Sequence, residues 1–332
     1  MTRREALALL GGLAAAAGCS RPAVSPPPMA APVPPLRLDP LVDLVATAGL
    51  LWLLEVHAEE LLASPVVAPA VALLVPPARF DAFAEHQGGV DLRRVSRLVV
   101  AGYEGATLTL AATPVQPARV EAAFTARALN VDGRAVEGGV TRLWGTVGAE
   151  REQVALFDRA AVGLERGHFG PLRAATYFAR GMLKRAQPAL RVEPLARIAR
   201  LLGDAPLRAF APGPFEGAWG AGLGGLLRAT TAAGASVHVA ERPPSGALEV
   251  QLVLAGAWGA DAPRAAERLA AAFQLLADDP LGRLLGIDHP LEDPRVSGDD
   301  EALRLQVVLD PLAVARGLKA ATDARISEIM AY

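Results

Sequence analysis

The stretch Thr107-Leu-Thr-Leu-Ala-Ala112, followed by Pro117-Ala-Arg-Val-Glu-Ala-Ala-Phe124, decides the fold that we expect for this chain. Polar and apolar residues alternate in the first part, which is typical of a strand with one buried face. In the second part a proline stands in the first turn of a helix, and Val120, Ala123 and Phe124 share one face of it. The stretch therefore predicts a strand followed by an amphipathic helix.

A similar pair of segments recurs in the second half of the chain. Val250-Gln-Leu-Val-Leu-Ala255 is followed by Pro263-Arg-Ala-Ala-Glu267, and the helix predicted there extends beyond Phe273. Each half also shows the order strand, helix, strand, strand, helix, strand. These elements include predicted strands over Val136–Val147 and Leu303–Leu309, a helix over 172–186, and a last helix capped by Asp310-Pro311. We therefore expect an α+β fold of two related lobes, with mainly antiparallel sheets and helices packed on them. Coincidence in an alanine-rich chain is the alternative explanation.

Four parts follow from the composition along the chain. Residues 1–18 are predicted to be a signal peptide, 19–40 a linker, 41–187 the first lobe and 188–332 the second lobe. Prolines are dense up to Pro35, and proline favours extended polyproline II structure. The linker is either a spacer that lifts the body off a membrane or a tether of no set length.

Charge and cysteine content exclude several classes of protein. The 332 residues are 52% hydrophobic and carry a formal net charge of −2, so they predict a globular body without a basic excess for nucleic acid. Of the basic residues only Lys184 and Lys319 are lysines, which with the alanine, glycine and proline content suggests a GC-rich genome. Because Cys19 is the only cysteine, no disulfide forms within the chain.

The first nineteen residues have the features of an export signal. Thr2-Arg3-Arg4 is a short basic start, Ala6–Ala17 is an uncharged apolar run, and Gly18 precedes Cys19. The apolar run is too short to span a hydrocarbon core of about 30 Å as a helix.

Ala16-Ala17-Gly18-Cys19 resembles the lipobox of bacterial lipoproteins, although that family usually has leucine where Ala16 stands. The resemblance implies that the Cys19 sulfur receives a diacylglycerol and that the new amino terminus receives a third acyl chain, such as palmitate. Membrane lipid is then a partner through acylated Cys19. The alternative is an ordinary secretory signal that is cut near Ala16 and leaves a soluble protein.

Two further resemblances concern the route and the destination. Thr2-Arg3-Arg4-Glu5-Ala6-Leu7 resembles a twin-arginine signal, although that family favours phenylalanine where Ala6 stands. Ser20 follows the cysteine instead of aspartate, and by resemblance to lipoprotein sorting this implies the outer membrane, facing the periplasm or the cell surface. The body resembles uncharacterised lipoproteins of GC-rich bacteria, a resemblance that brings no known activity.

A glycine-rich segment, Gly220-Ala-Gly222-Leu-Gly224-Gly225, has the spacing of a dinucleotide-binding loop. The segment does not directly follow a predicted strand, and its surroundings do not predict a βαβ unit. Close packing of a helix of small residues is the expected role. An alternative is that the apolar segment 209–227 contacts lipid or a partner.

Acidic and histidine residues were the other candidates for chemistry. The acidic residues of segments 288–293 and 299–301 predict a solvated loop, because the spacing of an EF-hand is absent. His57-Ala-Glu59-Glu60 lacks the second histidine of a zinc-protease helix, and capping of a helix by the carboxylates is expected. His86, His168 and His238 have no partner at ligand spacing. The sequence therefore assigns no catalytic, cofactor-binding or metal-binding residue, and Cys19 is its one predicted site.

Three functions remain open. The leading hypothesis is a non-catalytic, membrane-anchored envelope protein that binds a protein, a lipid or a wall component. The second is an envelope hydrolase that uses scattered aspartate and glutamate residues, as glycosidases use paired carboxylates. The third is a lipid carrier. A cleft with two buried carboxylates, a deep apolar cavity or a flat exposed patch would distinguish the enzyme, the carrier and the binding module, respectively.

Overall fold

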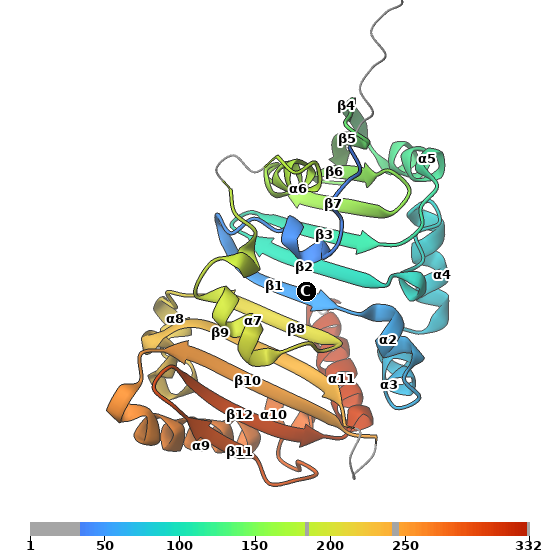
Figure 1. Ribbon diagram of the computed structural model, residues 1–332. Helices are drawn as coiled ribbons and strands as arrows, with labels where there is room; N and C mark the ends of the chain where they lie inside the picture. Colours follow the sequence, from blue (N-terminus) through green and yellow to red (C-terminus); the bar gives the residue numbers. More distant parts are fainter. Residues whose placement is uncertain (1–33, 183–185, 241–245, 331–332) are drawn as a thin grey trace, which may run out of the picture. The chain divides into compact units, whose positions relative to one another are not determined.

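Alternating apolar residues build one antiparallel sheet of twelve strands (Figure 1). The computed structural model describes residues 34–182, 186–240 and 246–330. The strands are β1 (Leu50–Val56), β2 (Arg97–Tyr103), β3 (Ala106–Ala112), β4 (Asn130–Glu137), β5 (Val140–Val147), β6 (Glu150–Phe157), β7 (Ala161–Gly167), β8 (Leu207–Pro212), β9 (Thr230–Val239), β10 (Leu248–Gly256), β11 (Arg295–Gly298) and β12 (Ala302–Leu309). Their order in the sheet is β11-β12-β10-β9-β8-β1-β2-β3-β7-β6-β5-β4.

The helices fill the connections between these strands. The α-helices are α2 (Ala58–Ala63), α3 (Val67–Leu74), α4 (Pro77–His86), α5 (Pro117–Arg127), α6 (Pro171–Ala179), α7 (Leu195–Leu202), α8 (Gly217–Gly220), α9 (Ala262–Asp278), α10 (Pro280–Leu284) and α11 (Pro311–Met330). Short 3-10 helices are η1 (Leu41–Leu44), η2 (Leu92–Arg94), η3 (Ala189–Arg191), η4 (Leu223–Ala229) and η5 (Gly259–Asp261).

The two halves of the chain meet inside the sheet. Strand β1 pairs with β2 on one side and with β8 on the other, and Leu53 lies opposite Phe210 across the junction. The expected α+β class and the antiparallel pairing are confirmed. The halves share one continuous sheet, because the backbone hydrogen-bonding groups at the outer edges of β1 and β8 pair with each other.

The two faces of the sheet are covered differently. On the face that carries α6 and α7, which we call the α6 face, a single core runs across both halves and includes Leu53, Val99, Phe210 and Val253. The opposite face, which we call the α9 face, holds two separate cores. One core lies under α9 and the other lies under α5. Figure 1 shows α6 and α7 in front of the sheet and α9 behind its lower half.

Between the two cores of the α9 face, the central strands remain partly open. Trp52 on β1 is 43% exposed, and Leu54, Val100 and Thr109 on β1, β2 and β3 are only half-buried. Side chains in a close-packed core are fully buried. The partial exposure of these side chains therefore shows that this strip of the sheet is accessible to solvent or to a ligand.

Most predicted elements form, and the differences have local causes. The predicted strand Val136–Val147 contains β5 and only the end of β4, because Gly138 and Gly139 turn the chain with positive φ angles of 57° and 81°. The rest of β4, from Asn130, is not predicted by the sequence. The helix predicted over 172–186 ends earlier, at Ala179. Strand β11 lies where we predicted a loop. Asp310 accepts hydrogen bonds from the first amides of α11 and caps this helix as expected.

Strand β4 forms one edge of the sheet. Its only strand neighbour is β5, and the pairing is interrupted between Val131 and Gly133. The side chain of Val136 is 60% exposed, whereas Arg134 pairs with Glu121 on α5 through two hydrogen bonds of 2.9 and 3.2 Å.

Candidate functional site

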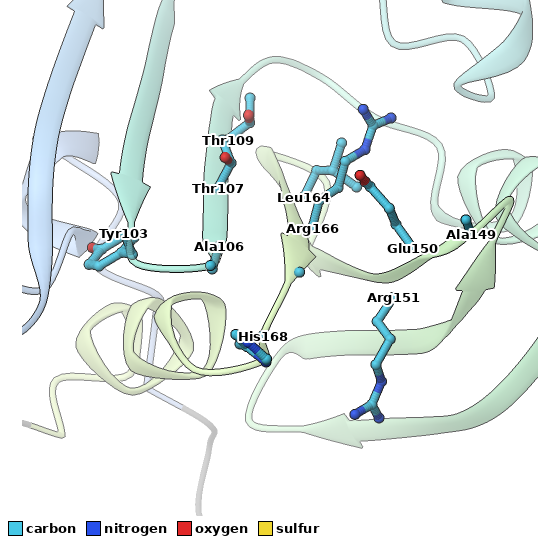
Figure 2. A pocket seen from close by; sticks show the side chains of 12 residues that line it. Tyr103, Ala106, Thr107, Thr109, Ala149, Glu150, Arg151, Leu164, Arg166 and His168 are labelled. Carbon is cyan, nitrogen blue, oxygen red and sulfur yellow. The ribbon is translucent and has the colours of Figure 1, made fainter.

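A shallow depression opens on the α9 face over β3, β7 and the start of β6 (Figure 2). It has a volume of about 690 Å³ and is lined by Tyr103, Gly105, Ala106, Thr107, Thr109, Ala149, Glu150, Arg151, Leu164, Arg166, Gly167 and His168. Figure 2 shows the Thr107 and Thr109 side chains on β3 beside Leu164 and Arg166 on β7, with Glu150 rising on the far side. Together with Trp52, which lies next to it, we call this depression the β3–β7 trough.

Trp52 joins the trough through one row of cross-strand neighbours. Trp52 pairs with Gly102, Gly102 with Thr107, and Thr107 with Arg166. A Cβ atom added to Gly102 would lie 2.2 Å from the indole nitrogen of Trp52. Only glycine therefore allows the indole to lie against this strand, and the ring sits next to the floor of the trough.

Two threonine hydroxyls face the trough from β3. Neither Thr107 nor Thr109 makes a side-chain hydrogen bond to any residue of the described ranges, and Thr107 is exposed. A threonine hydroxyl both donates and accepts, so each offers an unused hydrogen-bonding group at a fixed place on the sheet. The threonines favour the strand as well, because they are β-branched.

Arg166 is held in place by Glu152, its cross-strand neighbour on β6. Its Nε donates to the carboxylate of Glu152 over 3.1 Å, and Glu152 also forms an ion pair with Arg127 of α5. Glu152 is buried, so two arginines neutralise a carboxylate that would otherwise be costly to bury. The terminal nitrogens of Arg166 have no other partner among the residues that the structure describes, and the Arg166 side chain is half exposed.

A second buried carboxylate, Glu165, lies on the other side of the same strand. It is fully buried, and its Oε1 accepts a hydrogen bond of 2.9 Å from the amide of Gly170 at the start of α6. Its Oε2 has no hydrogen-bond partner within the described ranges. Burial raises the pKa of Glu165 to about 7, and hydrogen bonds from the Gly170 and Leu172 amides oppose this shift.

Tyr103 lines the trough and lies near enough to Glu165 to be affected by its charge. Its hydroxyl donates to the carbonyl of Ala46 over 3.0 Å. Burial raises the pKa of Tyr103 above its ordinary value, and the charge of Glu165 adds to the shift. Tyr103 is therefore a neutral hydrogen-bond donor at any physiological pH, and its position is fixed by the backbone.

The buried carboxylates do not form a glycosidase pair. Glu55 on β1 is the third of them, and Arg208 on β8 donates to it from Nε over 3.1 Å. Glu152 is neutralised by two arginines, and Glu165 caps α6. None of the three carboxylates lines the cavities that we describe. Their geometry therefore supports the packing of the sheet and does not favour hydrolysis.

Histidines meet at another place, the end of β1. His57 and His238 line one cavity of about 550 Å³, and the Nδ1 of His57 lies 3.1 Å from Oε2 of Glu60. No pattern in the sequence predicts that these two histidines are neighbours, because they come from different halves of the chain. The Nε2 of His57 is buried without a hydrogen-bond partner in the described part of the chain. Across that part, no group of three or more histidine, cysteine or acidic residues is arranged to hold a metal ion.

The other predicted segments have structural roles. The glycines of the 220–225 segment follow α8 and not a strand, as expected, and Arg268 of α9 donates to the carbonyl of Gly224. The acidic segment 299–301 forms the turn between β11 and β12, in which Asp299 pairs with Arg304. Glu292 pairs with Arg295. Cys19 lies outside the described residues.

Comparisons of the chain with protein-family models, with curated proteins and with solved structures find no match. In the described ranges no single helix has the length and apolar character needed to cross a membrane. By length and composition alone, the bent pair α3 and α4 meets that criterion.

The residues of the β3–β7 trough were missed by sequence reasoning. Trp52, Thr107 and Arg166 come from three separate strands, and no local motif contains them. One signal was available, because Thr107 and Thr109 alternate with buried leucines and therefore had to share the outer face of β3.

Proposed function

We propose that this protein is a lipid-anchored module of the bacterial envelope that binds its ligand without catalysing a reaction. The observation that carries the proposal is the position of Cys19, the only cysteine, directly after the apolar run of an export signal. Acylation would make this residue the anchor. The proline-rich segment that follows would act as the spacer between the membrane and the body.

Three acyl chains on one residue hold a protein stably. Each buried methylene contributes about 0.8 kcal/mol, and a single myristoyl chain gives only marginal binding. Ser20 after the cysteine favours the outer membrane as the destination, by resemblance to lipoprotein sorting. Support for a binding role comes from the open β3–β7 trough on the sheet. It offers the Trp52 indole, the terminal nitrogens of Arg166, and two threonine hydroxyls that make no side-chain hydrogen bond within the described ranges.

The anchor is tested by changing Cys19. We expect Cys19→Ala to abolish acylation, and mass spectrometry of the mature amino terminus is the measurement. Wild-type protein should show a diacylglyceryl cysteine with an acylated amine. An unmodified amino terminus produced by a cut near Ala16 would refute the anchor. Membrane fractionation serves as a secondary readout only, because an uncut precursor also binds through its apolar run.

We also infer that the two halves are related lobes derived from one ancestral unit. Supporting this, β1-β2-β3-β7-β6 and β8-β9-β10-β12-β11 have the same order along the chain and in the sheet. Both α5 and α9 follow the third strand of their half and begin with a proline in the first turn. An experimental structure in which these two sets of strands fail to superpose would contradict the inference.

A further inference from the structure

From the groups in the β3–β7 trough we propose that its ligand is an oligosaccharide, of the kind found in cell-wall glycan. This inference rests on the proposed binding function and specifies its ligand. The groups that carry it are Trp52, Thr107, Thr109, Glu150 and Arg166.

The first step concerns the indole. Trp52 lies along the floor row of the trough, next to Gly102, and 43% of its surface is exposed. The face of an aromatic ring carries partial negative charge and attracts the electropositive C–H bonds of a sugar ring. The indole lies against Gly102 with part of its surface accessible, and aromatic side chains are frequent central contacts in binding sites, so the indole is suited to serve as a platform.

The second step concerns the polar groups in line with this platform. Neighbouring strands lie about 4.8 Å apart, so Arg166, three strands from Trp52, is roughly 14 Å away across the row. Thr107 lies between them. A ligand along this row would meet an aromatic surface, neutral hydroxyls and a guanidinium in succession. This sequence of groups matches a chain of rings that carries hydroxyl or amide groups at regular intervals.

The third step excludes other ligands by geometry. An extended peptide cannot add to β3, because this strand is paired with β2 and β7 on its two sides. A lipid chain needs an enclosed apolar cavity, whereas the trough is open and mixes apolar side chains such as Leu164 with the polar groups of Thr107, Glu150 and Arg166. Nucleic acid needs a basic surface, but Glu150 lies beside Arg166 (Figure 2), and the guanidinium of Arg151 lies over the ring of Phe169 at 4.6 Å.

Arg166 is also prepared for such a ligand. The pairing of its Nε with Glu152 fixes the side chain and leaves the terminal nitrogens without another partner among the residues described. A guanidinium that is already oriented loses less conformational entropy on binding than a free one. Arg166 is therefore a positioning and hydrogen-bonding residue at one end of the trough.

The experiment uses the full-length lipoprotein purified in detergent. The probes are chito-oligosaccharide, measured by isothermal titration calorimetry, and purified peptidoglycan sacculi, measured by co-sedimentation. We expect wild-type protein to bind both. Trp52→Ala should weaken binding about tenfold or more, as is typical of a central aromatic contact. Thr107→Val keeps the shape and β-propensity of the side chain and should weaken binding about threefold to tenfold, the effect of one lost hydrogen bond.

The matched control is Leu51→Ala. Leu51 is the neighbour of Trp52 and is 54% exposed, but it does not line the trough. This variant should bind like wild type. Urea unfolding shows which variants are folded, and Thr107→Val keeps the test valid if Trp52→Ala is unstable. Wild-type protein that binds neither probe, or a Thr107→Val variant that binds both as tightly as wild type, would overturn the oligosaccharide assignment.

A photo-crosslinking amino acid at position 109 distinguishes failure of the oligosaccharide assignment from failure of the binding function itself. If wild type binds neither glycan and the crosslinker captures a protein in intact cells, the ligand class is wrong and the binding function stands. If the crosslinker captures neither a glycan nor a protein, the trough is not a binding site, and the proposed binding function is refuted as well. Lipidation of Cys19 is measured separately and is unaffected by either result.

Discussion

Apart from β4 and β5, the two halves of the sheet have the same strand order, but they leave opposite faces open. In the first half, η1 and α6 cover the α6 face, while the α9 face has a core under α5 and carries the β3–β7 trough. In the second half, α9 covers the α9 face, while the α6 face beyond α7 is a polar surface with His238, Gln251 and Arg295. Covering elements, and not strand order, therefore determine where each half can bind.

The comparison also extends to the last helix of each half. Helix α6 starts beside Glu165, a carboxylate buried on β7, whereas α11 starts beside Asp310, the residue directly before its first turn. A cap from within the preceding strand ties the start of α6 to the sheet. A local cap stabilises α11 without such a tie.

The largest effect is expected where the halves join. Phe210 on β8 is almost fully buried opposite Leu53, and Phe210→Ala should lower the free energy of unfolding by about 3–5 kcal/mol. If the halves unfold as one unit, urea denaturation monitored by circular dichroism and by tryptophan fluorescence should give one coincident transition. Two separated transitions would show that the halves are independent. The exposed edge residue Val136 supplies the control, because Val136→Ala should change stability by less than about 0.5 kcal/mol.

The ion pair across the same junction should have the next largest effect. Arg208→Leu leaves the buried Glu55 without its partner and should cost about 2–4 kcal/mol. The double variant Glu55→Leu/Arg208→Leu should recover most of this loss, because it removes the unpaired charge. A double-mutant cycle of unfolding free energies measures the coupling. Equal losses in the single and double variants would argue that the pair contributes only packing.

Glu165 should make the first half sensitive to pH. Its pKa is raised to about 7, so the folded state binds this proton more tightly than the unfolded state does. The contribution is therefore most favourable at acid pH and is lost as pH rises toward and through 7. Glu165→Gln keeps an acceptor for Gly170 and should stabilise the protein at pH 8 by on the order of 1–3 kcal/mol, with little effect at pH 5. Urea unfolding at the two pH values tests this, and an equal effect at both would refute it.

The smallest effect concerns the cap of the second half. Asp310→Ala removes the acceptor of the Leu312 and Ala313 amides and should cost about 1 kcal/mol. Asp310→Asn should retain most of the stability, because asparagine is also a good cap. Thermal unfolding by calorimetry is sensitive enough for this comparison. A loss for Asp310→Asn as large as that for Asp310→Ala would mean that charge, and not the hydrogen bond, stabilises the helix.

Sequence patterns predict most of the elements but not their assembly. Alternation predicted β3, β10 and β12, and Asp310-Pro311 predicted the start of α11. Strand β11 is four residues long and mostly exposed, so it has no apolar pattern to detect. The pairing of β1 with β8 involves segments far apart in the chain, and no local signal specifies it.

The candidate site was hidden for the same reason. Trp52, Thr107 and Arg166 are neighbours only because β1, β2, β3 and β7 lie side by side in this order. Their separate patterns look like an apolar strand, an alternating strand and one arginine among many. Gly102 was equally inconspicuous, although the position of the Trp52 ring depends on it. Prediction of Cys19 required only local residues, which is why the sequence alone could propose it.

Strand β4 has a consequence for behaviour at high concentration. A sheet that ends in an open strand offers its backbone to other chains, and an exposed valine at such an edge promotes aggregation. Here the interruption between Val131 and Gly133 and the charges of Asp132, Arg134 and Glu137 act against stacking of copies. The charged residues of this edge therefore disfavour pairing of β4 with the edge strand of another copy.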